Sequence, residues 1–459
     1  MSLFSTLGIG RSGLQAASIG IETTSHNVAN AGVEGFHRRT LETKNPTSRL
    51  HNGYILGQGV QVSRIRRAQD QFLGVRVVES TGLSSAAATV SSVLSNVEQA
   101  FNEANSSGVN ETLQEFFDSL SDSTADPGDH GLRQNLSATA EALAETVSRT
   151  AVYLDNTIVD IEKQLETTVE QANTLIKALA ATNEAINSSG DPVGAGDLLD
   201  ERDRLAQQIS AITGGKVSYG ESGQVNMYIG GHAVVSGVEW RELTAGTDSN
   251  GDPKILMETG NGDVDVTSIL HGTLGGNIEA RETTMGYLDS LNTFASTFSD
   301  AMNLQHAAGF DMNGAVGGDL FTYSTGSEAM SMSFSTDIID DDSLWAFAGA
   351  VTANIGDDTN LQSLMDVEGT NMFTSTTETS GEFLASLLNT VAADVTRASN
   401  DAKAAAAQAD DVEGLMASLT GVDLDQEAVS LIEFQAAYQA SAKVVQAADQ
   451  MLQVLLNTL

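Results

Sequence analysis

The chain has 459 residues, of which 41% are hydrophobic and 5% aromatic, and its formal net charge at pH 7 is -39. At roughly 100 to 200 residues per domain it should divide into two to four units, and its few aromatic side chains favour slender helical packing. The negative charge disfavours nucleic acid and anionic lipid as partners, and the absence of cysteine excludes disulfides, thiol catalysis and cysteine-ligated metals.

The first predicted element is a helix that stops near residue 32. Two interleaved rows of apolar or small residues recur every seven positions: Leu7, Leu14, Ile21 and Val28, and Leu3, Gly10, Ala17 and Thr24. Asn30 or Gly32 can adopt the left-handed conformation that ends a helix. We assign residues 1–35 to the N-terminal helix of an inner, tube-forming domain.

The N-terminal region also differs in charge from the rest of the chain. Residues 1–80 hold nine Lys or Arg against five Asp or Glu. A mildly basic part facing an acidic body could help to select subunit register, although ordinary solvated surface charge explains the imbalance as well. Residues 1–13 lack a basic leader, and no 18-residue apolar run occurs, so we expect neither a cleaved signal peptide nor a membrane span.

Short extended segments follow, and then a very long helix. Between residues 33 and 78, glycine and proline separate β-prone pieces, which is typical of hairpins. Heptad spacing then predicts a helix from about residue 132 to residue 186, roughly 80 Å long at 1.5 Å per residue. We assign residues 36–213 to extended hairpins and a long-helix rod domain.

A β-rich region separates this helix from later ones. Val225, Met227 and Ile229 alternate as in a half-buried strand, and residues 248–252 form a turn. We expect a mostly β-rich outer domain at residues 214–342, which includes one connecting helix at about 284–305. Residues 343–421 are predicted to be return helices of the rod domain.

The C-terminal helix of the inner domain, assigned to residues 422–459, carries a second stripe. Its positions follow a 3,4 spacing with one polar exception: Leu431, Phe434, Tyr438, Ser441, Val445, Ala448, Leu452, Leu455 and Leu459. Apolar stripes at both chain ends need a cover, because terminal helices otherwise fray. A helical hairpin within one subunit would provide that cover without assembly, whereas contact with neighbouring subunits is the hypothesis that we favour.

The residues that could carry chemistry are scattered. The seven histidines show no HExxH or paired spacing for zinc, and the acids of residues 126–130 flank a Pro-Gly turn. Asp311, Asn313 and Asp319 match part of a calcium loop, but Thr322 stands where that loop needs a bidentate Glu. Residues 272–276 are glycine-rich without the Lys-Ser/Thr of a phosphate loop, which indicates a loop opening the next helix. We therefore expect no catalytic residue, metal or cofactor, and no enzyme.

Several motifs resemble one family. Residues 24–31 (TSHNVANA) and 35–39 (GFHRR) are similar to the N-terminal signature of flagellar rod, hook and hook-associated proteins. Four further stretches resemble the hook-associated members that form the hook-filament junction. They are residues 198–205 (LLDERDRL), 275–281 (GGNIEAR), 303–311 (NLQHAAGFD) and 421–444. His37 occupies a place where the family commonly has Ser, and the region after Phe321 is shorter than in many members.

The resemblance implies a structural subunit of the bacterial flagellum. It would be exported through the flagellar type III apparatus without a cleaved signal peptide and lie outside the cell. The implied partners are further copies in a ring-like or helical segment, the hook protein, the second junction protein, and an export chaperone at the C-terminal helix. Neither nucleic acid nor membrane insertion is implied. A hook or distal-rod protein is the alternative, and a secreted enzyme or adhesin on a helical stalk is a third hypothesis.

The sequence thus predicts an α+β fold: a terminal-helix coiled coil and a long helical rod domain with an inserted β-rich outer domain. Its predicted function is self-assembly. The predicted assembly interface comprises Leu7, Leu14, Ile21, Asn27, Val28, Asn30, Leu431, Phe434, Tyr438, Val445, Leu452, Leu455 and Leu459.

Overall fold

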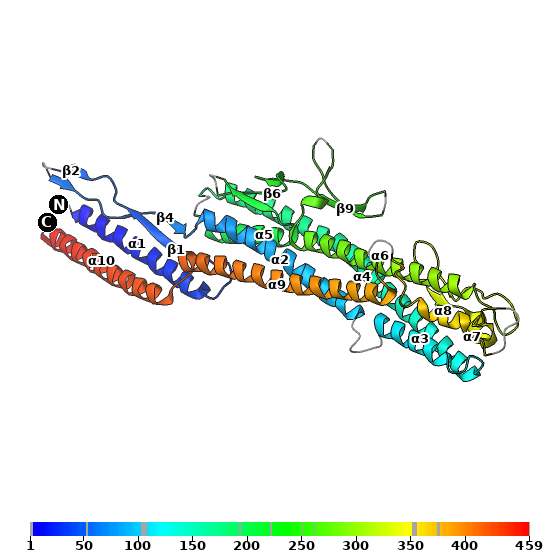
Figure 1. The fold of residues 1–459 in the computed structure, drawn as a ribbon. Helices are drawn as coiled ribbons and strands as arrows, with labels where there is room; N and C mark the ends of the chain where they lie inside the picture. Colours follow the sequence, from blue (N-terminus) through cyan, green and yellow to red (C-terminus); the bar gives the residue numbers. More distant parts are fainter. Residues whose placement is uncertain are drawn as a thin grey trace. The chain divides into compact units, whose positions relative to one another are not determined.

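The computed structural model describes residues 3–51, 54–101, 108–191, 194–220, 223–249, 251–260, 262–350, 356–373 and 377–458 (Figure 1). The chain forms two compact units, each assembled from several segments. The first unit comprises residues 1–85, 168–275 and 405–459, and the second comprises residues 86–167 and 276–404. Four long helices contribute residues to both units: α2 (Gln71–Ala100), α4 (His130–Ser188), α6 (Gly272–His306) and α9 (Ser380–Thr420).

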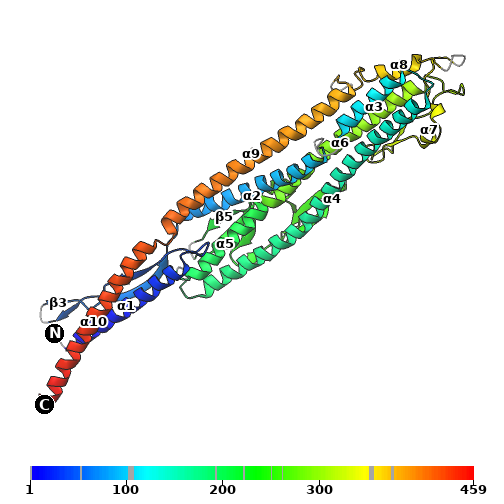
Figure 2. The same cartoon turned by 90° about the horizontal axis from the view of Figure 1, so that it is seen from below.

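In the first unit, the two terminal helices lie antiparallel and side by side. These helices are α1 (Leu3–Asn30) and α10 (Leu424–Thr458) (Figure 1 and Figure 2). On its other side, α1 contacts the antiparallel pair β1 (Arg39–Lys44) and β4 (Gln61–Arg67). A second antiparallel pair, β2 (Arg49–His51) and β3 (Tyr54–Leu56), lies between those two strands in the sequence. The stretch predicted to form hairpins therefore contains two of them.

Two small antiparallel sheets and α5 (Gly196–Thr213) complete the first unit. One has the order β5-β6-β7-β8, and the other has the order β11-β10-β9. Their strands are β5 (Lys216–Tyr219), β6 (Val225–Ile229), β7 (His232–Ser236), β8 (Glu239–Trp240), β9 (Leu243–Thr247), β10 (Pro253–Met257) and β11 (Val264–Asp265), followed by the 3-10 helix η1 (Thr267–Ile269).

Two buried asparagines of α4 hold these sheets. Asn183 accepts a hydrogen bond from the backbone N–H of Val225 at 3.1 Å and donates to the carbonyl oxygen of Val225 at 2.8 Å. Asn173 makes the same pair of hydrogen bonds with Leu243, at 2.9 and 2.7 Å. Because a buried amide must satisfy both its donors and its acceptor, each asparagine fixes one strand against the helix.

The second unit has an aromatic core formed by helices and short irregular segments. These include α3 (Val109–Ser123), β12 (Phe321–Thr322), β13 (Ser333–Phe334), α7 (Thr336–Asp340), the 3-10 helix η2 (Asp342–Leu344) and α8 (Thr359–Asp366). Phe116, Phe298 and Phe321 meet with ring centroids 5.5 to 6.1 Å apart. Trp345 is fully buried and donates from Nε1 to the hydroxyl of Ser137 at 3.0 Å. Nine buried aromatic side chains thus belong to this one core.

The predicted α+β class and the long helix are confirmed, since α4 spans His130–Ser188. The expected extent of the β-rich region differs from the structure. The helix expected at about 284–305 begins at Gly272, so residues 272–276 open the helix and are not a loop before it. Residues 309–342 belong to the second unit, whereas strands β5 to β11 belong to the first. Leu320, Phe321 and Phe334 explain this difference, because they are buried in the aromatic core of the second unit.

Candidate functional site

The contact between α1 and α10 is formed by small residues of α1. A Cβ atom placed on Gly10 would lie 2.8 Å from Cγ2 of Val445, and one on Gly13 would lie 2.5 Å from Oγ of Ser441. One placed on Gly20 would overlap the ring of Phe434. Ala17 is buried, at 3% exposure. Gly10, Gly13, Ala17 and Gly20 follow a 3,4,3 spacing, so one glycine-rich face lets the two helix backbones approach closely.

This seam differs from the stripe predicted from the sequence. The row Leu7, Leu14 and Ile21 is only half-buried, and Val28 is 43% exposed. Of the residues that approach α10, Gly10 and Ala17 belong to the interleaved row, whereas Gly13 and Gly20 belong to neither predicted row. Close packing of two helices depends on the shape of the surface as well as its hydrophobicity, and the large side chains of α10 need the space that the glycines leave.

The predicted interface residues of α10 and of the end of α1 take different positions. Phe434 and Val445 lie on the seam, while Leu431 and Leu452 are half-buried. Tyr438 and Leu455 are 43% and 48% exposed. Asn27 is buried, and Asn30 donates to the carbonyl oxygen of His26 at 2.9 Å, in the last turn of α1. Leu459 lies outside the described residues.

A large apolar surface of α10 has no cover within the described part of the subunit. The exposed apolar side chains of α10 away from the seam, together named here the outer face of α10, are Leu424, Val429, Ile432, Tyr438, Met451, Val454, Leu455 and Leu456, at 43% to 70% exposure. Near the chain end, Met451, Val454 and Leu455 line a hollow of about 540 Å³ together with Leu3. Apolar side chains gathered along one helix are the usual mark of a contact surface.

Asn27 joins three segments at the other end of the helix pair. Its side chain accepts from the backbone N–H of Arg39 at 3.0 Å and donates to the carbonyl oxygen of Arg39 at 2.8 Å. It also donates to Oε2 of Glu427 at 3.0 Å. Glu427 is 1% exposed and pairs with Arg38, whose Nε lies 2.7 Å from Oε1. A buried carboxylate in the first turn of a helix is stabilised both by this pairing and by the helix dipole.

A second ion-pair cluster ties the β1–β4 hairpin to α5. Arg67, 1% exposed in its side chain, places Nε 2.6 Å from Oδ1 of Asp200 and Nη2 2.7 Å from Oδ2 of Asp203. Arg39 reaches Asp197 at 2.5 Å and Asp200 at 3.4 Å. The Nδ1 atom of His37 lies 2.8 Å from Oδ1 of Asp200. The basic residues of the N-terminal region are thus used to fix the base of the helix pair.

The electrostatics of this cluster favour a charged Asp200. Burial acts to raise its pKa, but the hydrogen bond from His37 and the charge of Arg67 outweigh burial, so the pKa of Asp200 lies below its usual value. Burial, followed by the charge of Asp203, raises the pKa of Tyr219, whose hydroxyl donates to Asp203 at 3.4 Å. The guanidinium of Arg202 lies over the Tyr219 ring at 5.1 Å. Asp200 therefore stays ionised and holds two arginines in place.

Sequence reasoning missed the role of this cluster. It noted the basic N-terminal region and the LLDERDRL stretch separately, as a charge imbalance and as a family motif. One signal in the sequence could have joined the two observations. Residues 1–80 have an excess of arginine, and Asp197, Asp200 and Asp203 follow at the three-residue spacing of a helix, so the two segments carry opposite charge. Only the fold brings residues more than 130 positions apart into contact.

The other residues singled out for chemistry have structural roles. His306 is fully buried, with Nδ1 2.7 Å from the carbonyl oxygen of Gly318, and Nε2 accepts from the N–H of Ala346 at 2.9 Å. Asp311 accepts from the N–H groups of Asn313 and Ala315, both at 2.8 Å, which makes this stretch a turn. Within the described residues, no group of three or more His, Asp or Glu is arranged to hold a metal ion. No described helix is apolar and long enough to cross a membrane.

Two family models match the chain. The model of the flagellar hook-associated protein FlgK helical domain matches residues 94–321. The model of the flagellar basal body rod FlgEFG protein C-terminal region matches residues 416–458, which include all of α10. The long helices α4 and α6 and the C-terminal helix α10 therefore lie in two separate family signatures.

Curated relatives and a solved structure agree with these matches. Flagellar hook-associated protein 1 of Salmonella typhimurium is 31% identical over 323 residues, which cover 68% of this chain and 58% of that protein. The protein of the same name from Bacillus subtilis is 27% identical over 99% of this chain and 98% of its own length. The structure of the flagellar hook junction protein FlgK from Burkholderia pseudomallei superposes with a TM-score of 0.65 and covers 74% of this chain and 99% of that chain. At 14% identity this last likeness concerns the fold alone.

Proposed function

The chain belongs to the flagellar hook-associated protein 1 family, and we propose that it is a structural subunit of the bacterial flagellum that assembles at the hook-filament junction. The observation that carries this proposal is the outer face of α10. A subunit that keeps eight large apolar side chains exposed along one helix needs neighbours to cover them.

The mechanism that follows is burial of the outer face between copies. Within one subunit the glycine seam of α1 already accepts Phe434 and Val445, so the terminal helices enter the assembly as a preformed pair. Contact with neighbouring pairs would then bury Ile432, Val454 and Leu456, which are 63% to 70% exposed. Burial of such side chains contributes roughly 1.5 to 3 kcal/mol each, before the entropy cost of ordering. The predicted interface residues Tyr438 and Leu455 belong to the same surface.

The finer parts of the proposal concern partners and export. The subunit would form a ring-like or helical segment with copies of itself, with the hook protein on one side and the second junction protein on the other. Before export, a chaperone would cover the apolar α10, and export would use the flagellar type III apparatus to a position outside the cell. No nucleic acid, cofactor or membrane insertion is part of this proposal, and the family is one of structural flagellar proteins.

A hook or distal-rod protein is the second candidate. The match of residues 416–458 to a rod-protein model favours it, because it places α10 in a signature shared along the flagellar axis. The FlgK helical-domain match over residues 94–321 favours the junction instead. Position in the flagellum separates the two candidates.

The test is to label this protein on intact flagella and to express two variants. We expect a single band of label between hook and filament. Replacement of Ile432 and Val454 by Asp should abolish incorporation, because two charges would enter the buried contact. Leu304, which is 78% exposed on α6, supplies the matched control, and Leu304→Asp should leave incorporation unchanged. Label along the hook or rod, or normal junctions from the double variant, would contradict the proposal.

A further inference from the structure

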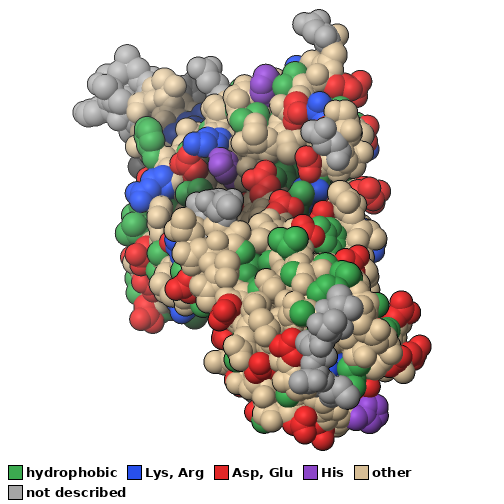
Figure 3. Space-filling model, turned by 45° about the vertical axis from the view of Figure 1, so that its right-hand side comes forward, with side chains coloured by type: hydrophobic (Ala, Val, Ile, Leu, Met, Phe, Trp, Pro, Cys, Tyr) green, Lys and Arg blue, Asp and Glu red, His purple; other side chains and the backbone are tan. Residues whose placement is uncertain are grey.

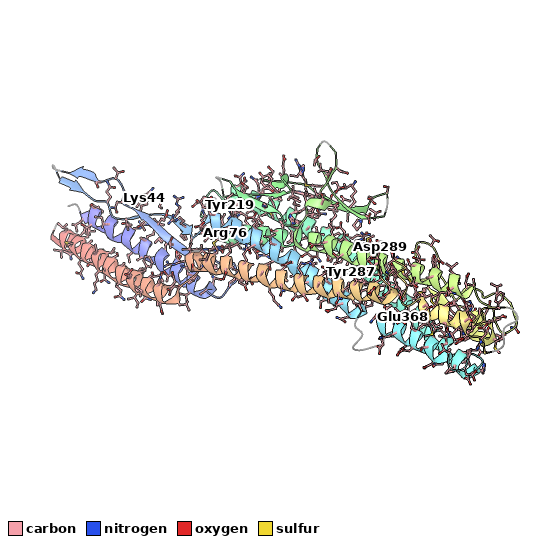
Figure 4. All side chains as sticks on the ribbon, viewed as in Figure 1. Lys44, Arg76, Tyr219, Tyr287, Asp289 and Glu368 are labelled. Carbon is pink, nitrogen blue, oxygen red and sulfur yellow. The ribbon has the colours of Figure 1, made fainter. Side chains whose placement is uncertain are left out.

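The first unit presents a positively charged surface on the β1–β4 hairpin. Lys44 is exposed, and it lies on the side of the hairpin away from α10 (Figure 4). Arg64 and Arg66, 42% and 60% exposed in their side chains, share a single acid, with Nε atoms 3.0 and 2.9 Å from the carboxylate of Glu42. Two cations thus share one carboxylate, and Lys44, two residues after Glu42 on β1, adds a third positive charge. We name Lys44, Arg64 and Arg66 the basic surface.

An acidic surface lies on the last turns of α9, in the same unit. Its members, Asp410, Asp411 and Glu413, are all exposed, and among the described residues none of them forms an ion pair. The acidic surface continues into apolar side chains, because Leu415 and Leu419 follow Asp411 at four-residue spacing and are 53% and 62% exposed. Asp411 and the two leucines therefore share one face of the helix, and Asp410 and Glu413 lie beside it.

The basic surface also has an apolar neighbour. The chain leaves β4 at Arg67 and enters α2 at Gln71, and Phe72 in the first turn is 87% exposed. Such an aromatic side chain in water is a usual anchor of a protein contact. Each charged surface therefore adjoins exposed apolar groups. Protein interfaces have the same composition, with a charged or polar rim around an apolar core.

The net charge of the molecule makes the basic surface unusual. With a formal charge of -39, the subunit repels its own copies at long range, and acidic side chains predominate over basic ones on the face shown in Figure 3. A local positive surface is the feature that can orient one copy on another, because opposite charges steer encounter and fix register. A contact between two different surfaces of identical subunits is heterologous, and heterologous contacts build rings or helical filaments.

We propose that the basic surface of one copy docks on the acidic surface of the next copy, with Phe72 packed against Leu415 and Leu419. This inference rests on the proposed function as a self-assembling subunit and adds the pair of surfaces that sets subunit register. This pair of surfaces is separate from the outer face of α10, which would supply most of the apolar surface buried in the proposed assembly.

A charge-swap experiment on the full chain tests the inference. In flagellated cells that carry the variant as their only copy, Arg64→Glu with Arg66→Glu should reduce incorporation at the junction about tenfold or more. Asp410→Arg with Asp411→Arg should do the same, and the combination of all four should restore incorporation to within about threefold of the parent chain. The matched control is Arg241→Glu with Lys254→Glu, which changes the net charge equally at one exposed position between β8 and β9 and one half-buried position on β10, and it should have no effect.

Cysteine cross-linking gives an independent measurement, because the chain has no cysteine of its own. Ser63 is exposed next to Arg64, and Gly414 has open space around it. Oxidation of flagella that carry Ser63→Cys and Gly414→Cys should produce a ladder of linked subunits, whereas Ser63→Cys with Thr244→Cys should not. Normal junctions from the reversed pairs, no rescue by the combination, or a link from either cysteine to a different protein would overturn the inference. None of these results would contradict the proposed function, because that function is tested by the position of the labelled protein on intact flagella and by the Ile432 and Val454 variants of α10.

Discussion

Asn27 and Glu427 are separated by 400 residues, yet the amide of Asn27 donates to Glu427 at 3.0 Å in a buried contact. The same carboxylate holds Arg38 at 2.7 Å. One residue of the C-terminal helix therefore fixes the end of the N-terminal helix and the start of the hairpin.

Replacement of Glu427 by Ala should loosen this junction. It would leave the buried Asn27 amide and Arg38 without their acceptor, at a cost of about 1 to 3 kcal/mol in the free energy of unfolding of the first unit. Amide hydrogen exchange should become faster in residues 20–30 and in the first turns of α10. The exposed Glu433 on the same helix serves as control, and Glu433→Ala should leave exchange as it is. Equal protection in both variants would mean that the contact adds nothing to the pairing.

The glycine seam predicts opposite effects for two glycines of α1. Gly20→Ala should destabilise the helix pair by about 1 to 3 kcal/mol, because the new methyl group would overlap the ring of Phe434. Gly8→Ala should be neutral or stabilise α1 by up to about 1 kcal/mol, because nothing lies within 4 Å of its Cβ position. Urea unfolding followed by the helical circular dichroism signal measures both. The seam as described would be wrong if the two variants changed stability in the same direction.

Acid should weaken the second unit through His306. Burial lowers the pKa of His306 from its usual value of 6.5, although the nearby Gly318 carbonyl and acids oppose this. The unfolded chain therefore takes up a proton at a higher pH than the folded one, so stability is full above pH 6.5 and falls as the pH drops toward the folded pKa. His306→Gln should reduce the pH dependence of the second unit between pH 7 and 5, while His232→Gln, on β7 of the first unit, should leave it unchanged. An unaltered slope in the His306 variant would refute this assignment.

Asp200 should matter at lower pH and in the first unit. Its folded pKa lies below the ordinary value of 3.8, so its contribution is complete above pH 3.8 and is lost as the pH falls through the folded pKa. Asp200→Asn should cost about 3 to 5 kcal/mol at neutral pH, because it leaves the buried Arg67 without half of its charge partners. Glu201→Gln, at the exposed neighbouring position that pairs with Arg204, is the matched control and should cost less than about 1 kcal/mol. Denaturant unfolding at pH 7 and pH 3 distinguishes them, and a small loss in the Asp200 variant would show that the cluster is not needed for stability.

Part of the fold could be predicted because its signal is local. The apolar row of residues 158–186 repeats every seven residues, and α4 extends two residues beyond each predicted end. The alternation of Val225, Met227 and Ile229 is likewise present in β6, where all three are buried. The extent of the β-rich region could not be predicted in this way. Residues 309–342 are turn-rich like the sheet region before them, but their buried side chains pack in the aromatic core of the second unit, with residues of α3 and α4 that lie much earlier in the chain.

The sequence by itself determined the helical terminal segments, the family motifs and the need to cover apolar stripes at both chain ends. Only the tertiary structure decided which face of α1 meets α10, because glycine carries no hydrophobic signal and its role appears when Phe434 and Val445 occupy the space beside it. It also decided which apolar residues stay exposed, such as Ile432 and Leu456 on α10. Periodicity fixes the face of a helix on which a side chain lies, but which face is buried depends on the shape of the partner surface.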